Sequence, residues 1–268
     1  MNFNQYLAQN KALIAMIHLP ALPGTPKSNL SPSQIIKSAV HEAKIYQKAG
    51  IKALMIENMH DVPYLNTQAG HEIASLMAIV GHEIKKQTGM YCGIQILAGA
   101  NKAAMAAAYT SGMDFIRAEG FVFGHLADEG YIDSSAAELL RYRKAIGAEN
   151  VLVFTDIKKK HSSHAITSDV SLAETAKAAE FFLSDGVILT GKSTAEEANI
   201  TELKAVSASV KLPILIGSGI TNSNISDYYY LADGFIVGSY LKKDGNWQNP
   251  PDTERISKLL KAITKLKN

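Results

Sequence analysis

The chain has 268 residues, a mass of 28.9 kDa and a net charge of +2, with 47% hydrophobic and 19% charged residues. This composition excludes a disordered chain, and the weak positive charge gives no basis for nucleic-acid binding, which needs a focused basic patch. The single cysteine, Cys92, excludes an internal disulfide and a cysteine-based zinc cluster. We expect one domain over residues 1–268, located in the cytoplasm, because no targeting pattern opens the chain and no apolar run reaches the ~20 residues of a membrane span.

Apolar runs of strand length recur along the chain and alternate with segments of helical periodicity. The expected strands are residues 12–18, 52–57, 91–96, 113–118, 151–157, 186–190, 213–218 and 234–239. The expected helices are residues 32–49, 70–88, 101–111, 134–146, 171–183, 196–209, 222–230 and 252–266. The strands are almost continuously apolar, as parallel strands buried on both faces are. The alternation predicts an α/β fold, a (β/α)8 TIM barrel, with a doubly wound sheet as the rival fold.

Polar and ionisable residues gather at the C-terminal ends of these strands, where TIM-barrel enzymes place their chemistry. They are His18, Glu57, Asn58, Gln95, Arg117, Glu119, Asp156, Lys158, Lys160, Thr190, Gly191, Gly217, Ser218, Gly219, Gly238 and Ser239. The opposite strand ends carry mostly Gly, Ala, Lys and Asn. This asymmetry predicts a functional site at one mouth of the barrel.

The last two strands end in glycine-rich loops, Gly217-Ser218-Gly219 and Gly238-Ser239. Glycines let backbone N–H groups approach a phosphate closely, and a helix starting near Asn222 would add partial positive charge. Barrels often bind phosphate in these two loops. We therefore predict a phosphate site there; the alternative is that the glycines only make tight turns.

The fifth strand ends in Asp156, and Lys160 and His161 follow within five residues. A carboxylate, a lysine and a histidine at one mouth suit proton transfer or a Schiff base. The alternative is a solvated run of lysines. At a wet mouth, where solvent screens ion pairs, we expect these side chains to contribute little to stability.

Three further residues near the mouth each have a functional and a structural interpretation. Glu57 is either a general base or metal ligand, or a carboxylate paired with Arg117 or a lysine. His18 is either a catalytic acid or a hydrogen-bonded histidine under the rigid loop of residues 19–24. Arg117 either binds a substrate anion or neutralises a neighbouring carboxylate, because a buried arginine needs a partner.

Residues 186–193 match the P-loop pattern GxxxxGK[ST], ending in Lys192 and Ser193. A P-loop needs its middle residues in a loop that wraps the phosphates. Here those residues are Val-Ile-Leu-Thr, which predicts a strand. We therefore interpret the match as accidental.

Short motifs spread over nearly the whole chain carry a family resemblance. They are residues 16–24, Glu57-Asn58 with Asp61 and Pro63, residues 115–117, Asp156 with Lys160-His161-Ser162, Thr190-Gly191, residues 217–219, residues 232–239, and Lys242 to Asp244-Gly245. In these motifs the chain resembles the BtpA/SgcQ family. The resemblance implies a TIM barrel similar to ribulose-phosphate-binding barrels, and no settled reaction. Members have been described as photosystem I assembly factors, sugar-metabolism proteins and nucleoside triphosphatases.

The chain departs from the family pattern at two places near the mouth. Gln95 stands where asparagine is usual, and Ala118-Glu119 stands where Val-Asn is usual. Both departures fall at the expected mouth of the barrel.

Together these features predict an enzyme acting on a small phosphorylated metabolite, a sugar phosphate or nucleoside-derived phosphate. The reaction would be an aldol-type cleavage, an isomerisation or a related acid–base lyase step. The residues expected to share proton transfer are Asp156, Lys160, His161, Glu57 and His18. The residues expected to bind substrate and phosphate are Arg117, Asn58, Gln95, Thr190, Gly191, Gly217, Ser218, Gly219, Gly238 and Ser239.

Two alternative functions stay open: a non-catalytic assembly or regulatory factor that keeps the ligand site, and, less favoured, a nucleoside triphosphatase. The sequence indicates no organic cofactor and leaves a divalent metal and a homo-oligomer open. The expected partner is a small phosphorylated ligand, with no nucleic acid and no membrane span.

Overall fold

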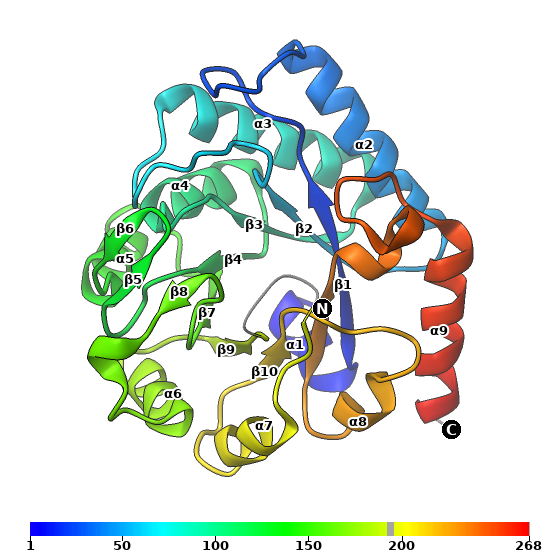
Figure 1. The fold of residues 1–268 in the computed structure, drawn as a ribbon. Helices are drawn as coiled ribbons and strands as arrows, with labels where there is room; N and C mark the ends of the chain where they lie inside the picture. The colour runs from blue at the N-terminus through cyan, green and yellow to red at the C-terminus, as the bar shows by residue number, and fades with distance from the viewer. Residues whose placement is uncertain (192–195, 268) are drawn as a thin grey trace.

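The computed structural model describes residues 1–191 and 196–267. Parallel strands close into a barrel in the order β1-β11-β10-β9-β7-β4-β3-β2, and β2 pairs back onto β1 (Figure 1). These strands are β1 (Ala12–His18), β2 (Ala53–Glu57), β3 (Tyr91–Gln95), β4 (Phe115–Ala118), β7 (Leu152–Asp156), β9 (Gly186–Leu189), β10 (Ile214–Ile216) and β11 (Gly234–Val237). Each lies inside one of the predicted runs. The TIM barrel is confirmed, and the doubly wound sheet is excluded because this sheet is closed.

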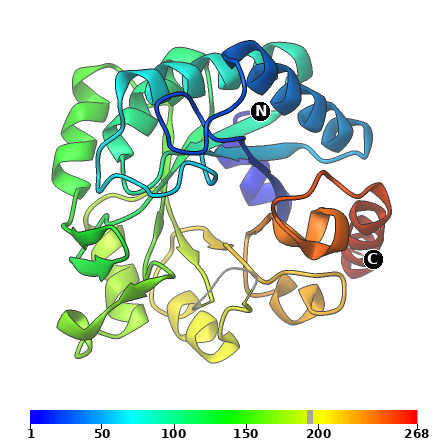
Figure 2. The same cartoon turned by 45° about the horizontal axis from the view of Figure 1, so that its top comes forward.

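Helices cover the outside of the barrel (Figures 1 and 2). They are α2 (Pro32–Lys48), α3 (His71–Thr88), α4 (Asn101–Ser111), α5 (Ala136–Ala145), α6 (Leu172–Phe181), α7 (Ile200–Ser207), α8 (Ile225–Tyr229) and α9 (Thr253–Lys267). Ser31 and Ser171 start α2 and α6 with capping boxes, which satisfy backbone donors that the first turn leaves free. Within the described residues, no helix is long and apolar enough to cross a membrane.

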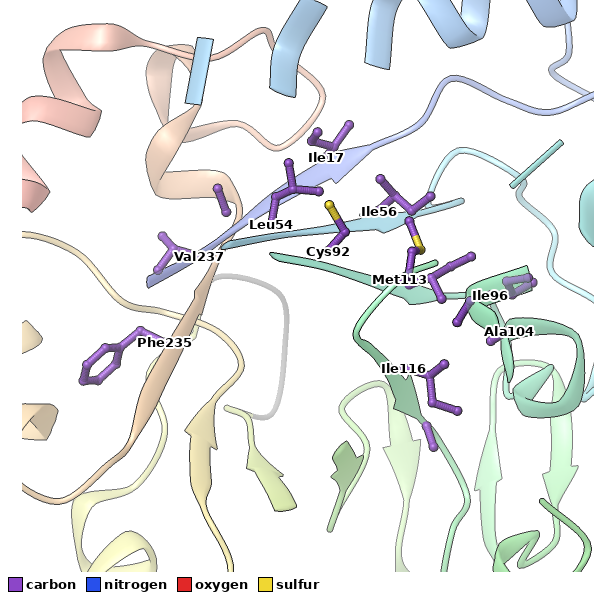
Figure 3. Packing of buried hydrophobic residues seen from close by; sticks show 14 of the residues in the cluster. Ile17, Leu54, Ile56, Cys92, Ile96, Ala104, Met113, Ile116, Phe235 and Val237 are labelled. Atoms are coloured by element: carbon purple, nitrogen blue, oxygen red, sulfur yellow. The ribbon is translucent and has the colours of Figure 1, made fainter. Parts of the chain in front are cut away.

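Two apolar cores lie on the two faces of the barrel sheet. The outer core joins the strands to the helices and includes Ile17, Leu54, Ile116 and Phe235 (Figure 3). The inner core fills the barrel and includes Ile14, Met55, Phe115, Phe154, Ile188 and Leu215. Because both faces are covered, the strands need apolar residues at successive positions, which explains their nearly continuous apolar character.

A helix that the sequence did not predict, α1 (Phe3–Gln9), closes the N-terminal end of the barrel. Its Phe3 and Leu7 are 2% exposed and belong to the inner core. The Phe3 ring stacks on Phe115 at 4.7 Å between centroids and meets Phe154 edge-on at 6.1 Å. Figure 1 shows α1 within the ring of strands. A segment of only seven residues is too short to give a clear periodic signal, so its two buried anchors were not recognised.

A small antiparallel sheet also lies outside the predicted pattern. It consists of β5 (His125–Ala127), β6 (Gly130–Ile132) and β8 (Ser162–Ser163), in the order β6-β5-β8. Short 3-10 helices are η1 (Ala165–Thr167), η2 (Ser239–Leu241) and η3 (Lys243–Gly245). The sheet connects the segment after β4 to the segment after β7, and so shapes one side of the mouth.

Candidate functional site

Alternation along the strands decides which side chains point into the barrel mouth. Inner-core residues such as Met16, Met55 and Ile236 point inward, so the positions two residues further on face the same way. Three of these positions are neighbours across adjacent strands. His18 of β1 pairs with Glu57 of β2, and Glu57 pairs with Gln95 of β3. The remaining inward positions after the other strands are Arg117, Asp156, Thr190, Gly217 and Gly238. The uppermost inward layer is therefore polar, except for two glycines that leave space.

That space is a cavity of about 150 Å³, which we call the mouth cavity. It is lined by ionisable side chains on one side and by the two glycine-rich loops on the other. The lining residues are Met16, His18, Glu57, Met59, Arg117, Lys160, residues 217–221, residues 236–240, Gly245 and Arg255. The cavity thus brings together residues from the beginning, middle and end of the chain. Residues 19–24 do not belong to its lining.

Arg117 and Asp156 form a buried ion pair at the floor of the mouth. Arg117 Nε and Nη2 each donate a hydrogen bond of 3.0 Å to Asp156, one to each carboxylate oxygen. The two side chains are only 5% and 1% exposed. Asp156 therefore does not stand at a wet mouth as expected; its carboxylate is engaged by Arg117, and only Arg117 reaches the cavity.

His18 and Glu57 lie side by side in the cavity, with His18 Nε2 3.9 Å from Glu57 Oε2. Burial lowers the pKa of His18 well below its usual value, and the charges of Lys242 and Lys160 lower it further. Burial raises the pKa of Glu57, although the charges of Arg117 and Lys160 act against that rise. At neutral pH His18 is therefore a neutral imidazole, and Glu57 is easier to protonate than an exposed glutamate.

The three consecutive lysines after β7 have three different environments. Lys158 donates a hydrogen bond from Nζ to the Val170 carbonyl at 3.1 Å and points away from the cavity. Lys159 pairs with Glu129 at 3.1 Å and approaches Glu119 at 3.9 Å. Lys160 lines the mouth cavity, and its pKa is lowered by burial and by the charge of Arg117. The three lysines therefore do not form the uniformly solvated run that was the alternative interpretation of the sequence.

The two glycine-rich loops meet along one wall of the cavity. Tyr240 donates a hydrogen bond of 2.6 Å to the Asn222 side chain, which joins the loops. The backbone N–H groups of Gly219 and Ser239 have no acceptor among the described residues. Helix α8 begins at Ile225 and has five residues, so the dipole expected near Asn222 is weak. A Cβ at Gly219 would lie 2.5 Å from the Glu196 carbonyl, so this glycine is also required by packing.

Asn58 and Gln95 are buried but do not line the mouth cavity. Asn58 donates to Asp61 at 2.8 Å and accepts from the backbone N–H of Leu97 at 2.8 Å, so it fastens neighbouring loops. Gln95 donates to Glu119 Oε1 at 3.0 Å.

Thr190, Gly191 and His161 also lie outside the cavity lining. Thr190 donates from its hydroxyl to the Lys158 carbonyl at 3.4 Å. The backbone N–H of Gly191 donates to the Ser218 hydroxyl at 3.0 Å, which links the loop after β9 to the loop after β10. His161 is exposed, with a left-handed φ of 54°.

Sequence reasoning missed Arg255, which lines the cavity from the first turn of α9. Its Nε donates to the Tyr240 carbonyl at 2.7 Å, and its guanidinium lies 4.6 Å from the centre of the Tyr240 ring. A cation in the first turn of a helix opposes the helix dipole. This unfavourable position in the first turn of α9 was the one feature of the sequence that indicated contacts of Arg255 with residues outside the helix.

Sequence reasoning also missed a buried charge cluster behind His18. Lys242, 1% exposed, pairs with Glu42 of α2, and the Tyr46 hydroxyl donates to Glu42 at 3.2 Å. Burial raises the pKa of Glu42, and Lys242 opposes that rise. The cluster ties the segment after β11 to α2 and places positive charge near His18.

Glu119 is 4% exposed, and its Oε2 has no hydrogen-bond partner among the described residues. Burial raises the pKa of Glu119 to about 7, opposed by Lys159. Across the described ranges, no three His, Cys, Asp or Glu side chains are grouped so that they could hold a metal ion.

The P-loop-like match lies partly in a strand. Gly186–Leu189 is β9, a strand of the closed barrel, while Lys192 and Ser193 lie outside the described residues. The first residues of the pattern therefore cannot wrap a phosphate.

The model of the BtpA family matches residues 9–265 of the chain. An uncharacterized mitochondrial protein of Caenorhabditis elegans is 50% identical over 95% of this chain and 94% of its own. An uncharacterized protein of Methanocaldococcus jannaschii is 36% identical, covering 97% of both chains. The photosystem I biogenesis protein BtpA of Synechocystis is 29% identical over 98% of this chain and 91% of its own.

Solved structures with the same architecture share little sequence with this chain. A geranylgeranylglyceryl phosphate synthase of Thermoplasma acidophilum, in complex with sn-glycerol-1-phosphate, matches with TM-score 0.62, 13% identity and 99% coverage of both chains. An orotidine 5'-phosphate decarboxylase of Pyrococcus horikoshii matches with TM-score 0.59 and 15% identity, over 94% of this chain and 99% of the other. These likenesses establish the fold.

Proposed function

We propose that this chain, which belongs to the BtpA family, is an enzyme that acts on a small phosphorylated metabolite by acid–base chemistry of the aldolase, lyase or isomerase type. One observation carries the proposal. A single cavity joins the two glycine-rich loops to His18, Glu57 and Lys160. A ligand held by its phosphate at the loops would place its reactive carbons among ionisable groups.

The loops and Arg255 supply the groups that a phosphate needs. The backbone N–H groups of Gly219 and Ser239, which have no acceptor in the described part of the chain, are available as donors to phosphate oxygens. Arg255 adds a guanidinium on the same wall, and its stacking on Tyr240 fixes its direction. Two of the structural relatives are named for phosphorylated compounds, which is consistent with a phosphorylated ligand here.

The opposite wall supplies groups suited to moving protons. The raised pKa of Glu57 favours a carboxyl that can donate a proton, and the lowered pKa of Lys160 favours an amine that can accept one. His18, kept neutral by burial, can hydrogen-bond a developing hydroxyl or enolate oxygen. Asp156 is assigned a positioning role, because its carboxylate is fully engaged by Arg117.

A second candidate is a non-catalytic assembly factor that keeps the ligand site. The name of the Synechocystis relative favours it. The two candidates differ in one measurable property: only an enzyme of the proposed type exchanges carbon-bound protons of a carbonyl phosphate with solvent. We expect dihydroxyacetone phosphate in D2O to incorporate deuterium faster with the protein than without it, by NMR, and the acceleration to be lost in Glu57→Gln.

The phosphate site is tested by thermal unfolding in millimolar phosphate, with chloride at equal ionic strength as reference. A ligand at ten times its Kd stabilises the folded state by about 1.4 kcal/mol, which raises the melting temperature by roughly 3–6 °C. Ser239→Asp places a carboxylate beside the expected anion and should abolish this shift.

Ser239→Ala is the matched control, because the Ser239 hydroxyl makes no hydrogen bond to any described residue. This variant should retain the shift. Gly238→Asp would be a poorer test, since its Cβ would lie 3.0 Å from His18 Cε1 and disturb the cavity by itself. An equal shift in Ser239→Asp and the parent would place phosphate elsewhere and contradict the proposal.

A further inference from the structure

The mouth cavity is lined by one lysine, Lys160, that forms no close ion pair with any carboxylate of the described residues. Lys158 and Lys159 are engaged by Val170 and by Glu129. Among the described residues, no carboxylate lies within ion-pair distance of Lys160 Nζ, although the side chain lines the cavity. The Lys160 side chain is partly buried, whereas lysines are mostly exposed to solvent. A structural role as a surface solubilising charge does not explain this placement.

The surroundings of Lys160 lower the pKa of its amine, which makes the neutral form easier to reach. Arg117 lies on the same cavity wall, and its charge together with burial lowers the pKa of Lys160. The charges of Glu57, Asp156 and Glu119 act in the opposite direction, but Asp156 is engaged by Arg117. A neutral, partly desolvated lysine amine is the nucleophilic form of this residue.

The backbone next to Lys160 is held in an uncommon conformation. His161 has a φ of 54°, in the left-handed region that residues with a Cβ seldom adopt. Such conformations cost free energy and persist where the surrounding structure imposes them, often at functional sites. Here the bend turns the chain immediately after Lys160, between β7 and the short strand β8.

We propose that Lys160 is a nucleophile that forms an imine with the carbonyl carbon of a small phosphorylated aldehyde or ketone. The inference rests on the proposed phosphate site, and it narrows the ligand to a carbonyl compound. The phosphate end would occupy the wall formed by the glycine-rich loops, and the carbonyl end would face Lys160 and Glu57. Both walls belong to the same cavity, so one small ligand can contact both of them.

The step balances without an oxidant or reductant. The Nζ lone pair forms a bond to the carbonyl carbon, while the carbonyl oxygen takes a proton from the Glu57 carboxyl group. The resulting carbinolamine expels that oxygen as water as the C=N bond forms, and the proton lost by nitrogen returns through Glu57. The products are the imine and one water molecule. A protonated imine then withdraws electrons from the neighbouring C–C or C–H bond, as aldol cleavage or isomerisation requires.

Reductive trapping tests the inference. The full chain is incubated with dihydroxyacetone phosphate or glyceraldehyde 3-phosphate, and sodium borohydride reduces any imine to a stable secondary amine. Mass spectrometry of the intact protein and of its peptides should show one adduct, located on Lys160. Unphosphorylated dihydroxyacetone at the same concentration should give much less adduct, because the phosphate wall does not hold it.

Variants separate this inference from the phosphate site. Lys160→Met should lose the adduct and keep the thermal shift with inorganic phosphate, whereas Lys158→Arg should keep both. A phosphate shift in the parent without a Lys160 adduct would overturn the imine and leave the phosphate site standing. Adducts of equal amount in Lys160→Met, or spread over surface lysines, would also overturn it. If the parent protein showed neither the thermal shift with phosphate nor the Lys160 adduct, both the phosphate site and the imine would be overturned.

Discussion

Removing the Asp156 carboxylate should leave a charged guanidinium buried without a partner. Arg117 and Asp156 are linked by two hydrogen bonds of 3.0 Å, and the two side chains are 5% and 1% exposed. Breaking a buried ion pair by removing one partner typically costs about 3–5 kcal/mol. Because domains are stable by only about 5–15 kcal/mol, Asp156→Ala should lose a large fraction of the free energy of unfolding.

The assay is urea unfolding followed by circular dichroism, with two controls. Glu138→Ala removes one partner of a pair with Lys102 whose side chains are 73% and 48% exposed, and should cost at most about 1 kcal/mol. The double variant Arg117→Met with Asp156→Leu removes both charges and should recover much of the loss. A cost for Asp156→Ala no greater than that for Glu138→Ala would refute the buried pair.

Three further predictions concern buried groups away from the Arg117–Asp156 pair. Phe3→Ala should destabilise the protein by about 3 kcal/mol in urea unfolding, because Phe3 fills the closed end of the barrel; an unchanged midpoint would contradict its burial. The pKa of Glu119 in the folded protein is raised to about 7, so the parent should lose about 2–3 kcal/mol of stability as the pH rises from 5 to 8. Glu119→Gln should lack this loss. Parallel curves of stability against pH for the parent and Glu119→Gln would contradict the raised pKa. Lys242→Met should destabilise the protein by about 3–5 kcal/mol at pH 8 and by less at pH 5, where Glu42 can protonate; a loss independent of pH would show that Glu42 does not stay charged.

The barrel could be predicted from the sequence because its signal is repetitive. Each strand needs apolar residues on both faces, so every strand appears as a continuous apolar run such as residues 12–18 or 186–190. Period-two alternation then places His18, Glu57 and Arg117 in the mouth without further information. The N-terminal helix was missed because only Phe3 and Leu7 anchor it.

The details of the site depend on contacts between distant segments, which no local pattern reports. Residues 158–160 are three consecutive lysines that the sequence alone does not distinguish. In the structure Lys158 contacts Val170, Lys159 contacts Glu129, and Lys160 lines the barrel mouth. Asp156 was expected to act in proton transfer, and its ion pair with Arg117 joins the ends of two separate strands, β4 and β7. Lys242 and Glu42 are 200 residues apart in the chain.

A crystal structure of the protein grown in inorganic phosphate tests the central claim most directly. We predict density for one phosphate in the mouth cavity, within hydrogen-bond distance of the backbone N–H groups of Gly219 and Ser239 and beside Arg255. A cavity filled with water at saturating phosphate, or a phosphate bound only outside it, would contradict the claim that this mouth is a phosphate-binding active site.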